Sequence, residues 1–360
     1  MKRVGWLVTG WLLLFGVAGW TGNAGAAIPA PLAEQVLRKA LAADGTQTYV
    51  GTMVLFTWAV GNGDATVIKV RHRAPGQSRL EYLSSRNEPY LVTVDDGRHR
   101  WHYHPGERAA SVGPSPDFKA NLEQSLGLLR HNYHLQYGGT GEVTGRITDI
   151  VELVPRGCRQ PAQRLWVDRE TGVILRTEQY RFDGSLAALT LFTAFEPAES
   201  LPPELFRLNL PKEVRVTTGF DAAARLEDLA EASGIAVRMP TELPPGFVFD
   251  GASVNRTDKE NIVHLRFTDG LSVISLFEQP AQPFTRYRLK GAKAVALKSG
   301  RGWLHEECGG YVLNWTSGGI NFTLVGEVAA EVLIRLADSI PPGPGPLAYV
   351  RSAFVRLFSR

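Results

Sequence analysis

Apolar and polar residues alternate with a period of two over much of the chain between residues 49 and 196, which predicts a large antiparallel sheet. Turn-forming sequences such as Gly61-Asn62-Gly63-Asp64 and Asp96-Gly97 separate these runs, as they do in hairpins. A further hairpin turn is expected at residues 169–172, Arg-Glu-Thr-Gly. The runs place strands at residues 49–60, 66–72, 79–83, 90–95, 98–103, 147–154, 164–168, 173–182 and 187–196.

Two helical patterns accompany these strands. The first opens at Pro31, has apolar residues three and four positions apart, and ends at Asp44-Gly45. The second covers residues 118–129. Because residues 50–60 are apolar on both alternating faces, we expect that strand to be covered on both sides, with the first helix as one cover.

A break in the apolar pattern divides the chain. Pro202, Pro203 and Pro211 punctuate the stretch that ends in the polar residues 212–218, so we place a domain boundary between residues 211 and 225. Beyond the boundary the pattern predicts a smaller α+β domain. Its helices are expected at 226–232 and 327–339, the latter with Glu327 and Glu331 in or near its first turn, and its strands at 248–254, 262–268, 271–277, 311–315 and 320–325.

The first residues predict export. Lys2 and Arg3 precede an apolar run over residues 4–20, and Ala24-Gly25-Ala26 supplies the small residues of a cleavage site. Residues 1–26 are therefore expected to be a secretory signal peptide. No later apolar run is long enough to span a bilayer, so we expect the mature chain in the periplasm or the cell-envelope space.

The last residues, 343–360, combine a Pro-Gly spacer with a segment whose apolar residues recur at helical spacing beside three arginines. Peripheral contact with an anionic membrane surface, docking in a partner's groove and packing against the second domain are alternative uses of this tail.

Charge and cysteine content exclude some classes of protein. The 39 basic and 36 acidic residues give a net charge of +3 without a basic stripe, so no nucleic-acid partner is expected. Cys158 and Cys308 are too few for a disulfide framework and lack the C-x-x-C spacing of zinc or redox sites. In an oxidising compartment they form either one bridge or two buried thiols.

We expect no enzyme, metal or cofactor, because the chain lacks the motifs that carry such chemistry. His102 and His104 share one face of a strand, but Arg98 and Arg100 crowd the same face with positive charge, which disfavours a metal. No G-x-S-x-G sequence marks a serine nucleophile. Gly138-Gly139-Thr140-Gly141 lacks the Lys-Ser/Thr of a phosphate-binding loop and is expected to be a mobile loop.

Four phrases together resemble one protein family, the MucB/RseB periplasmic regulators of extracytoplasmic-function (sigma-E) sigma-factor signalling. The phrases are LWVDRETG at 165–172, LPPGF at 243–247, TDGLSVISLF at 268–277 and VGEV at 325–328. The first phrase alone also fits the LolA/LolB lipoprotein carriers, but the later three in this order are more specific. The resemblance covers nearly all of the mature chain.

The resemblance implies an α+β, mostly antiparallel β protein. A LolA-like unclosed β-barrel with helices would occupy residues 27–215, and a smaller MucB/RseB C-terminal α+β domain would occupy residues 225–342. The chain would be a non-enzymatic negative regulator that binds the extracytoplasmic domain of a membrane-spanning anti-sigma factor and senses a lipid or lipoprotein acyl chain. A LolA/LolB-type carrier or chaperone is the alternative. Because a carrier needs only the first domain, the second domain favours partner recognition.

Aromatic side chains are abundant in the first domain. On an open sheet they either form ordinary core or line an apolar concavity for an acyl chain, and the resemblance favours the concavity. The candidate ligand-binding residues are Phe56, Trp58, Trp101, Tyr103 and Trp166.

Overall fold

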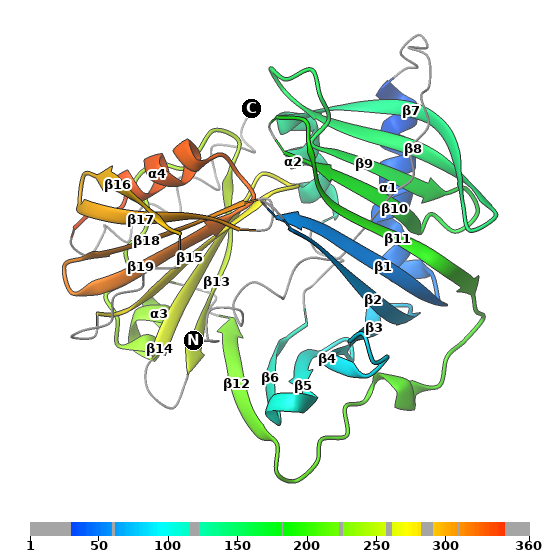
Figure 1. Cartoon of the computed structure of the whole chain (residues 1–360), viewed down its shortest axis with the longest axis horizontal. Coiled ribbons are helices and arrows are strands. Elements are labelled where there is room, and N and C mark those ends of the chain that lie inside the picture. The colour runs from blue at the N-terminus through cyan, green and yellow to red at the C-terminus, as the bar shows by residue number, and fades with distance from the viewer. Residues whose placement is uncertain are drawn as a thin grey trace. The chain divides into compact units, whose positions relative to one another are not determined.

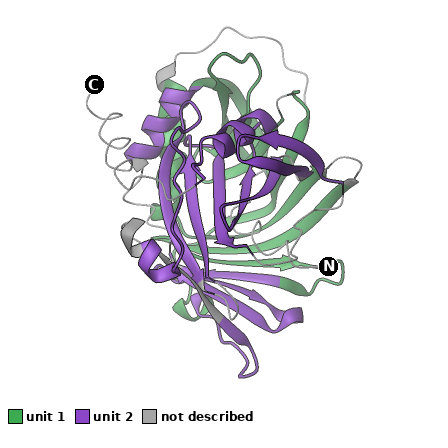
Figure 2. Ribbon diagram, turned by 90° about the vertical axis from the view of Figure 1, so that its left-hand side faces the viewer, with its two compact units in different colours: residues 1–90, 134–205 green, residues 91–133, 206–360 purple. Residues whose placement is uncertain are grey.

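The computed structural model divides into two compact units (Figure 2). Unit 1 comprises residues 1–90 and 134–205, and unit 2 comprises residues 91–133 and 206–360. The expected signal peptide and the tail at 343–360 lie outside the described residues, and none of the helices in the described part is long and apolar enough to cross a membrane. The structure describes residues 30–59, 62–115, 122–181, 183–222, 226–256, 261–281, 291–307 and 310–342.

Unit 1 is an antiparallel sheet with one long helix against it (Figure 1). The hydrogen-bonded strand order is β8–β9–β10–β11–β1–β2–β3, and β7 lies beside β8. Its elements are α1 (Ala30–Thr46), β1 (Tyr49–Ala59), β2 (Asn62–Arg73), β3 (Gln77–Leu83), β7 (Tyr133–Val143), β8 (Arg146–Pro155), β9 (Gln163–Asp168), β10 (Ile174–Tyr180), β11 (Leu186–Pro197) and the 3-10 helix η2 (Pro203–Phe206).

Helix α1 covers the face of the unit 1 sheet that carries the core. Met53 on β1 lies opposite Ile68 on β2 and Phe192 on β11, and all three side chains are at most 1% exposed. The buried side of the helix consists of Ala33, Val36, Leu37, Ala40 and Ala43. Each large apolar side chain buried in this way contributes about 1.5–3 kcal/mol. The expectation that the first helix lies on the sheet is therefore confirmed.

Unit 2 is also built on a sheet. Its strand order is β4–β5–β6–β12–β13–β14–β15–β19–β18–β17–β16, with every pair antiparallel except β6 and β12, which are parallel. Its elements are β4 (Pro89–Asp95, of which residues 89–90 belong to unit 1), β5 (His99–His104), η1 (Pro105–Glu107), β6 (Ala109–Pro114), α2 (Leu122–Asn132), β12 (Arg215–Ala222), α3 (Leu226–Ser233), β13 (Val248–Arg256), β14 (Asn261–Thr268), β15 (Val273–Pro280), β16 (Lys293–Leu297), β17 (Gly300–Glu307), β18 (Gly310–Ser317), β19 (Ile320–Gly326) and α4 (Ala330–Asp338).

The core of unit 2 lies between its sheet and helices α3 and α4. Helix α3 contacts β13 and β14, and α4 contacts β16, β18 and β19. The α4 side chains that enter the core, Leu333, Leu336 and Ala337, have the spacing of one helix face. They join a cluster in which Phe267 and Phe322 are at most 1% exposed.

Local apolar patterns predict the fold class and most elements correctly. The α+β, mostly antiparallel class is confirmed, as are α1, α3 and the β9–β10 hairpin turn. The second helix begins at Leu122 and ends at Asn132, three residues beyond its expected end, while residues 116–121 lie outside the described part. The last helix begins at Ala330 rather than at Glu327, so Glu327 is not in its first turn.

Five strands escape the sequence pattern: β6, β7, β12, β16 and β17. The expected break at residues 212–218 is in part strand β12, whose residues 215–218 pair with β6 about 100 positions earlier in the chain. This pairing also groups residues 91–133 with the C-terminal part of the chain, although they lie well before the boundary expected at 211–225. Pairing between residues distant in sequence, and not local alternation, joins β6 to β12.

One buried carboxylate predicts how stability depends on pH. Glu278 on β15 is fully buried, and the backbone N–H of Arg238 donates to both of its oxygens at 3.0 and 3.1 Å. Burial raises the pKa of Glu278 to about 8, against which the Arg238 contacts act in the opposite direction. A raised folded-state pKa contributes stability at low pH that is lost as the pH rises through that pKa.

We therefore expect Glu278→Gln to lower the pH dependence of stability between about pH 4.5 and 8. The wild type should lose stability relative to the variant as the pH rises over this range, because its unfolded chain releases the Glu278 proton above about pH 4.5 while burial keeps the folded protein protonated up to about pH 8. Urea unfolding at a series of pH values measures the difference. Parallel curves for the two proteins would contradict the assignment.

Candidate functional site

The face of the unit 1 sheet that points away from α1 carries three of the five candidate ligand-binding residues. Alternation along β1 places Phe56 and Trp58 on the face opposite to Met53. The register then continues this face from Phe56 to Leu189 on β11, to Glu178 on β10 and to Arg164 on β9, two residues from Trp166. We call this the outer face of unit 1.

Phe56 and Trp58 form a stacked aromatic pair on the outer face. Their ring centroids are 6.1 Å apart with an angle of 20° between the planes, and both side chains are half-buried. The guanidinium of Arg181 donates to the Trp58 carbonyl, which fixes the backbone at this position. The pair offers a partly exposed apolar surface for contact with another molecule.

These rings continue an apolar strip along the same strand. The outer strip of β1 consists of Val50, Thr52, Val54, Phe56 and Trp58, all half-buried. Eight residues of strand separate its ends, which corresponds to about 26 Å. The strip is therefore long and narrow, a shape that suits an extended apolar chain.

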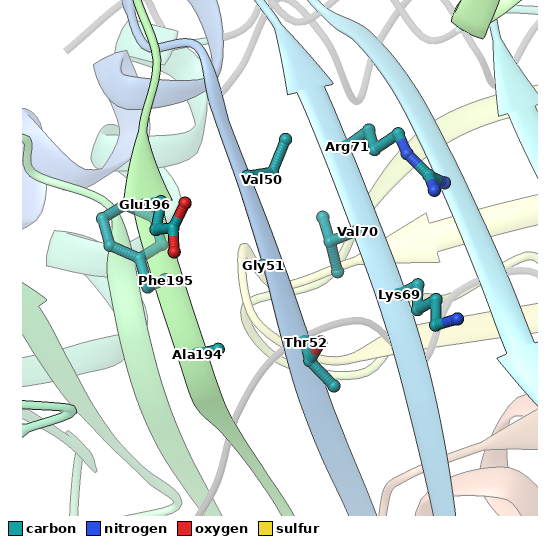
Figure 3. Close-up of a pocket in the computed structure, with 9 residues that line it drawn as sticks. All are labelled: Val50, Gly51, Thr52, Lys69, Val70, Arg71, Ala194, Phe195 and Glu196. Carbon is teal, nitrogen blue, oxygen red and sulfur yellow. The ribbon is translucent and has the colours of Figure 1, made fainter.

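A shallow pocket with a volume of about 230 Å³ lies at the Val50 end of the strip (Figure 3). It forms where Gly51 has no side chain and where β11 has a bulge opposite Thr52 and Met53. Lys69 and Arg71 on β2 bring positive charge to one side and Glu196 on β11 brings negative charge to the other. The pocket is lined by Val50, Gly51, Thr52, Lys69, Val70, Arg71, Ala194, Phe195 and Glu196.

The charges at the pocket favour a polar or ionic group of a ligand. Arg71 pairs with Glu81 on β3 at 3.3 Å, and Arg79 pairs with the same carboxylate at 2.7 Å. Lys69 is exposed and directly opposite Thr52 in the register. A molecule with an anionic head and an apolar tail would place the head near Lys69 and the tail along the strip.

Trp166 is on the outer face but is covered in this structure. The Arg176 guanidinium lies 3.8 Å from the centroid of the indole ring, and Trp166 and Arg176 are 7% and 5% exposed. A cation over a tryptophan ring in such a desolvated place contributes about 2 kcal/mol. Trp166 therefore packs under a cation and offers no open surface.

A network of ionic and polar side chains holds Arg176 over the ring. Arg176 donates to Glu178 at 2.7 Å, and the Tyr180 hydroxyl also donates to Glu178. Arg164 pairs with Glu152 at 2.5 Å and contacts the Tyr180 hydroxyl at 3.4 Å. Burial lowers the pKa of Arg176 and raises the pKa of Tyr180, so the phenol stays protonated and donates at neutral pH. The sequence pattern missed this network because its residues come from three strands whose register local alternation does not define.

The glycine segment expected to be a mobile loop is part of strand β7, and that expectation is wrong. A Cβ at Gly141 would lie 2.9 Å from two atoms of the Trp166 indole, and a Cβ at Gly138 would lie 2.9 Å from the Ile150 side chain. Glycine is needed at both positions because neighbouring side chains occupy the space of a Cβ. The segment therefore lets bulky side chains on β8 and β9 pack against β7.

The other two candidate residues belong to unit 2. Trp101 on β5 lies opposite Val94 and Val112, and Tyr103 lies on the same face of the strand; both rings are half-buried. His102, on the reverse face, contacts the Thr93 hydroxyl at 3.1 Å. Burial, with a smaller contribution from Arg100, lowers the pKa of His102 to about 4, so this imidazole is neutral at neutral pH. The five candidates thus divide into three on the outer face of unit 1 and two on β5.

Of the two cysteines, Cys158 is exposed, and Cys308 lies outside the described residues. A bridge between them stays a prediction.

Comparison with known proteins identifies a family that this sequence resembles. Residues 32–210 match the family model described as MucB/RseB N-terminal domain. The sigma factor AlgU regulatory protein MucB of Pseudomonas aeruginosa is 25% identical over 212 residues, which are 58% of this chain and 61% of MucB. The alignment therefore spans less than two thirds of that relative.

Solved structures with a similar fold include MucB in complex with the periplasmic part of MucA, with 22% identity, a TM-score of 0.57 and coverage of 87% of this chain and all of the matched chain. A second structure, the MucA/MucB complex of Pseudomonas aeruginosa, has 22% identity, a TM-score of 0.58 and coverage of 87% and 99%. MucB alone has 19% identity, a TM-score of 0.54 and coverage of 86% and 98%. These likenesses show the fold.

The contact between Gly141 and Trp166 predicts a specific sensitivity to substitution. Gly141→Val should lower the free energy of unfolding by about 1–3 kcal/mol, because the new side chain displaces an indole held from above by Arg176. Urea unfolding measures the loss. Gly45→Ala is the matched control: it lies in α1 with no atom within 4 Å of its added Cβ, and should leave stability unchanged or slightly higher. Equal stability of the two variants would contradict the packing described for Trp166.

Proposed function

The chain belongs to the MucB/RseB family, and we propose that it is an exported negative regulator of an extracytoplasmic-function sigma factor. In this proposal it binds the extracytoplasmic domain of a membrane-spanning anti-sigma factor and shields that protein from regulated proteolysis. The observation that carries the proposal is the match of residues 32–210 to the family's N-terminal domain. The cation, apolar run and small residues of the first 26 positions support export to the periplasm or cell envelope.

The fold of the remaining chain supports a regulator over a simple carrier. A carrier requires one open sheet to hold its cargo, whereas unit 2 adds a second sheet with its own core and two packed helices. The solved relatives with this two-part fold include MucB bound to the periplasmic part of MucA. We assign partner recognition to the whole chain by analogy with that assembly.

We also propose where a lipid or lipoprotein acyl chain is sensed. The outer strip of β1 supplies an apolar track, and the pocket at its Val50 end supplies cations for a head group. Phe56 and Trp58 are then direct ligand contacts. Trp166 acts through its neighbours, because Arg176 must move before a ligand can touch the ring. Trp101 and Tyr103 stay candidates for contact with a partner or ligand on unit 2.

Partner binding is the first prediction. The mature chain from residue 27 should form a stable complex with the extracytoplasmic segment of the anti-sigma factor encoded beside its sigma factor in the same genome. Size-exclusion chromatography and calorimetry measure the complex. A LolA-type carrier from the same organism is the control and should not bind. Failure of the folded mature chain to bind that segment would overturn the proposal.

Ligand binding on the outer strip is a separate prediction. Phe56→Asp and Trp58→Asp should each weaken binding of a fluorescent fatty acid by at least about tenfold, because the new carboxylate would have to lose water against an acyl chain. Lys69→Glu should weaken binding of the fatty acid more than binding of a neutral fluorescent alcohol of the same chain length.

Thr140→Glu provides the matched control, since it adds the same negative charge at an exposed position of β7 in unit 1. Circular dichroism checks that each variant is folded. If both aspartate variants are folded and bind the fatty acid as the wild type does, the outer strip is not the ligand site.

A further inference from the structure

Residues 91–133 lie in the middle of the segment that matches the family's N-terminal domain, yet they pack with the C-terminal part of the chain. The family match runs from 32 to 210, whereas the compact units assign 91–133 to unit 2. We infer that residues 91–133 are an insert that folds and unfolds together with the C-terminal sheet. This inference does not depend on the proposed partner or ligand.

The first observation is a hydrogen-bonded contact at the end of α2, which we call the α2 lock. The Asn132 Nδ2 group donates to the carbonyl oxygens of Gly246 at 2.9 Å and Asp269 at 2.7 Å. The next residue, Tyr133, donates its hydroxyl to the Asp269 Oδ2 atom at 2.7 Å in a buried site. Two consecutive side chains thus hold two separate turns of the C-terminal segment.

Asp269 is itself fixed by its own turn. Its Oδ1 atom accepts the backbone N–H groups of Leu271 at 2.9 Å and Ser272 at 2.7 Å, which leaves Oδ2 for Tyr133. Burial raises the pKa of Tyr133, and the nearby Asp269 carboxylate adds to this effect, so the phenol stays protonated and remains a donor. The Asp269 carboxylate therefore joins Tyr133, at the end of the insert, to the turn between β14 and β15.

Close backbone approach is the second observation. Gly246 and Gly270 have φ angles of +84° and +97°, which glycine adopts readily. A Cβ at Gly246 would lie 2.0 Å from the Asn132 side-chain oxygen, and one at Gly270 would lie 2.9 Å from the Leu128 Cβ. These glycines belong to the LPPGF and TDGLSVISLF phrases. The two phrases therefore form turns and also supply the backbone against which α2 packs.

The third observation is that the other end of the insert is also tied to the C-terminal segment. Strand β6 pairs in parallel with β12 from Ala109 opposite Arg215 to Val112 opposite Thr218. Just before this ladder, the Arg215 N–H donates to the Arg108 carbonyl at 3.0 Å. Strand β12 continues into pairing with β13. The insert is thus held by a strand ladder at β6 and by the α2 lock at its end.

Hydrogen exchange with mass spectrometry on the full mature chain, in increasing denaturant, tests the inference. Peptides from 91–133 should lose protection at the same denaturant concentration as peptides from 261–280 and 310–340. Asn261→Ala, which removes a bond to the Ser233 carbonyl within unit 2 but outside the lock, serves as a matched variant. It should lower the midpoints of the C-terminal peptides and of the insert together, while peptides from 49–59 and 146–155 keep theirs.

Asn132→Ala should separate the insert from the C-terminal sheet. Exchange in 122–133 should become at least about tenfold faster, because two partly buried carbonyls lose their donor, while peptides from 310–340 change less. Tyr133→Phe keeps the ring but removes the hydroxyl, so it should accelerate exchange in 122–133 by a smaller factor. This variant replaces Asn132→Ala in the test if Asn132→Ala does not fold. The inference is overturned if the insert follows peptides 49–59 and 146–155 in Asn261→Ala, or if neither lock variant changes exchange in 122–133.

Discussion

The two-sided pairing of β1 is the constraint on which unit 1 depends. This strand is hydrogen-bonded along nearly its whole length to β2 on one edge and to β11 on the other, so its register cannot slip without reversing every side chain. One set of alternating residues, with the buried Met53 at its centre, faces the core. The other set, which ends in Phe56 and Trp58, must then face outward whatever its apolar character. The candidate site is a direct consequence of that register.

Much of this arrangement could be predicted from the sequence. The pattern over residues 49–60 predicts a strand and the spacing after Pro31 predicts a helix on the sheet, and both are confirmed. The expectation that residues 50–60 are covered on both sides is wrong, because the outer residues of β1 are half-buried and α1 contacts β8 and β9. Aromatic content marks Phe56, Trp58 and Trp166 as candidates, and they do share one face. What alternation does not provide is register between distant strands. The stacking of Arg176 on Trp166 depends on a bulge in β10, which no local pattern indicates.

The glycines also show that local sequence does not reveal packing between distant residues. Read locally, Gly138 to Gly141 indicates flexibility, but the space a Cβ would occupy at Gly141 is filled by Trp166 from two strands away. Gly246 and Gly270 likewise indicate turns, and their positive φ angles agree. Their second role, close contact with the end of α2, follows only from the packing of residues separated by more than 100 positions. Long-range packing therefore explains both the wrong expectation and the missed coupling between the sequence-defined halves.

In the proposed function, the chain holds a sigma-factor pathway inactive through an envelope partner. The most direct test of that claim is transcription from a promoter that depends on the cognate extracytoplasmic-function sigma factor, in cells with and without this chain. Deletion should raise transcription without an external stress, and the wild-type chain should return it to the basal level. Unchanged transcription in the deletion strain, with the anti-sigma factor present and intact, would contradict the proposed function.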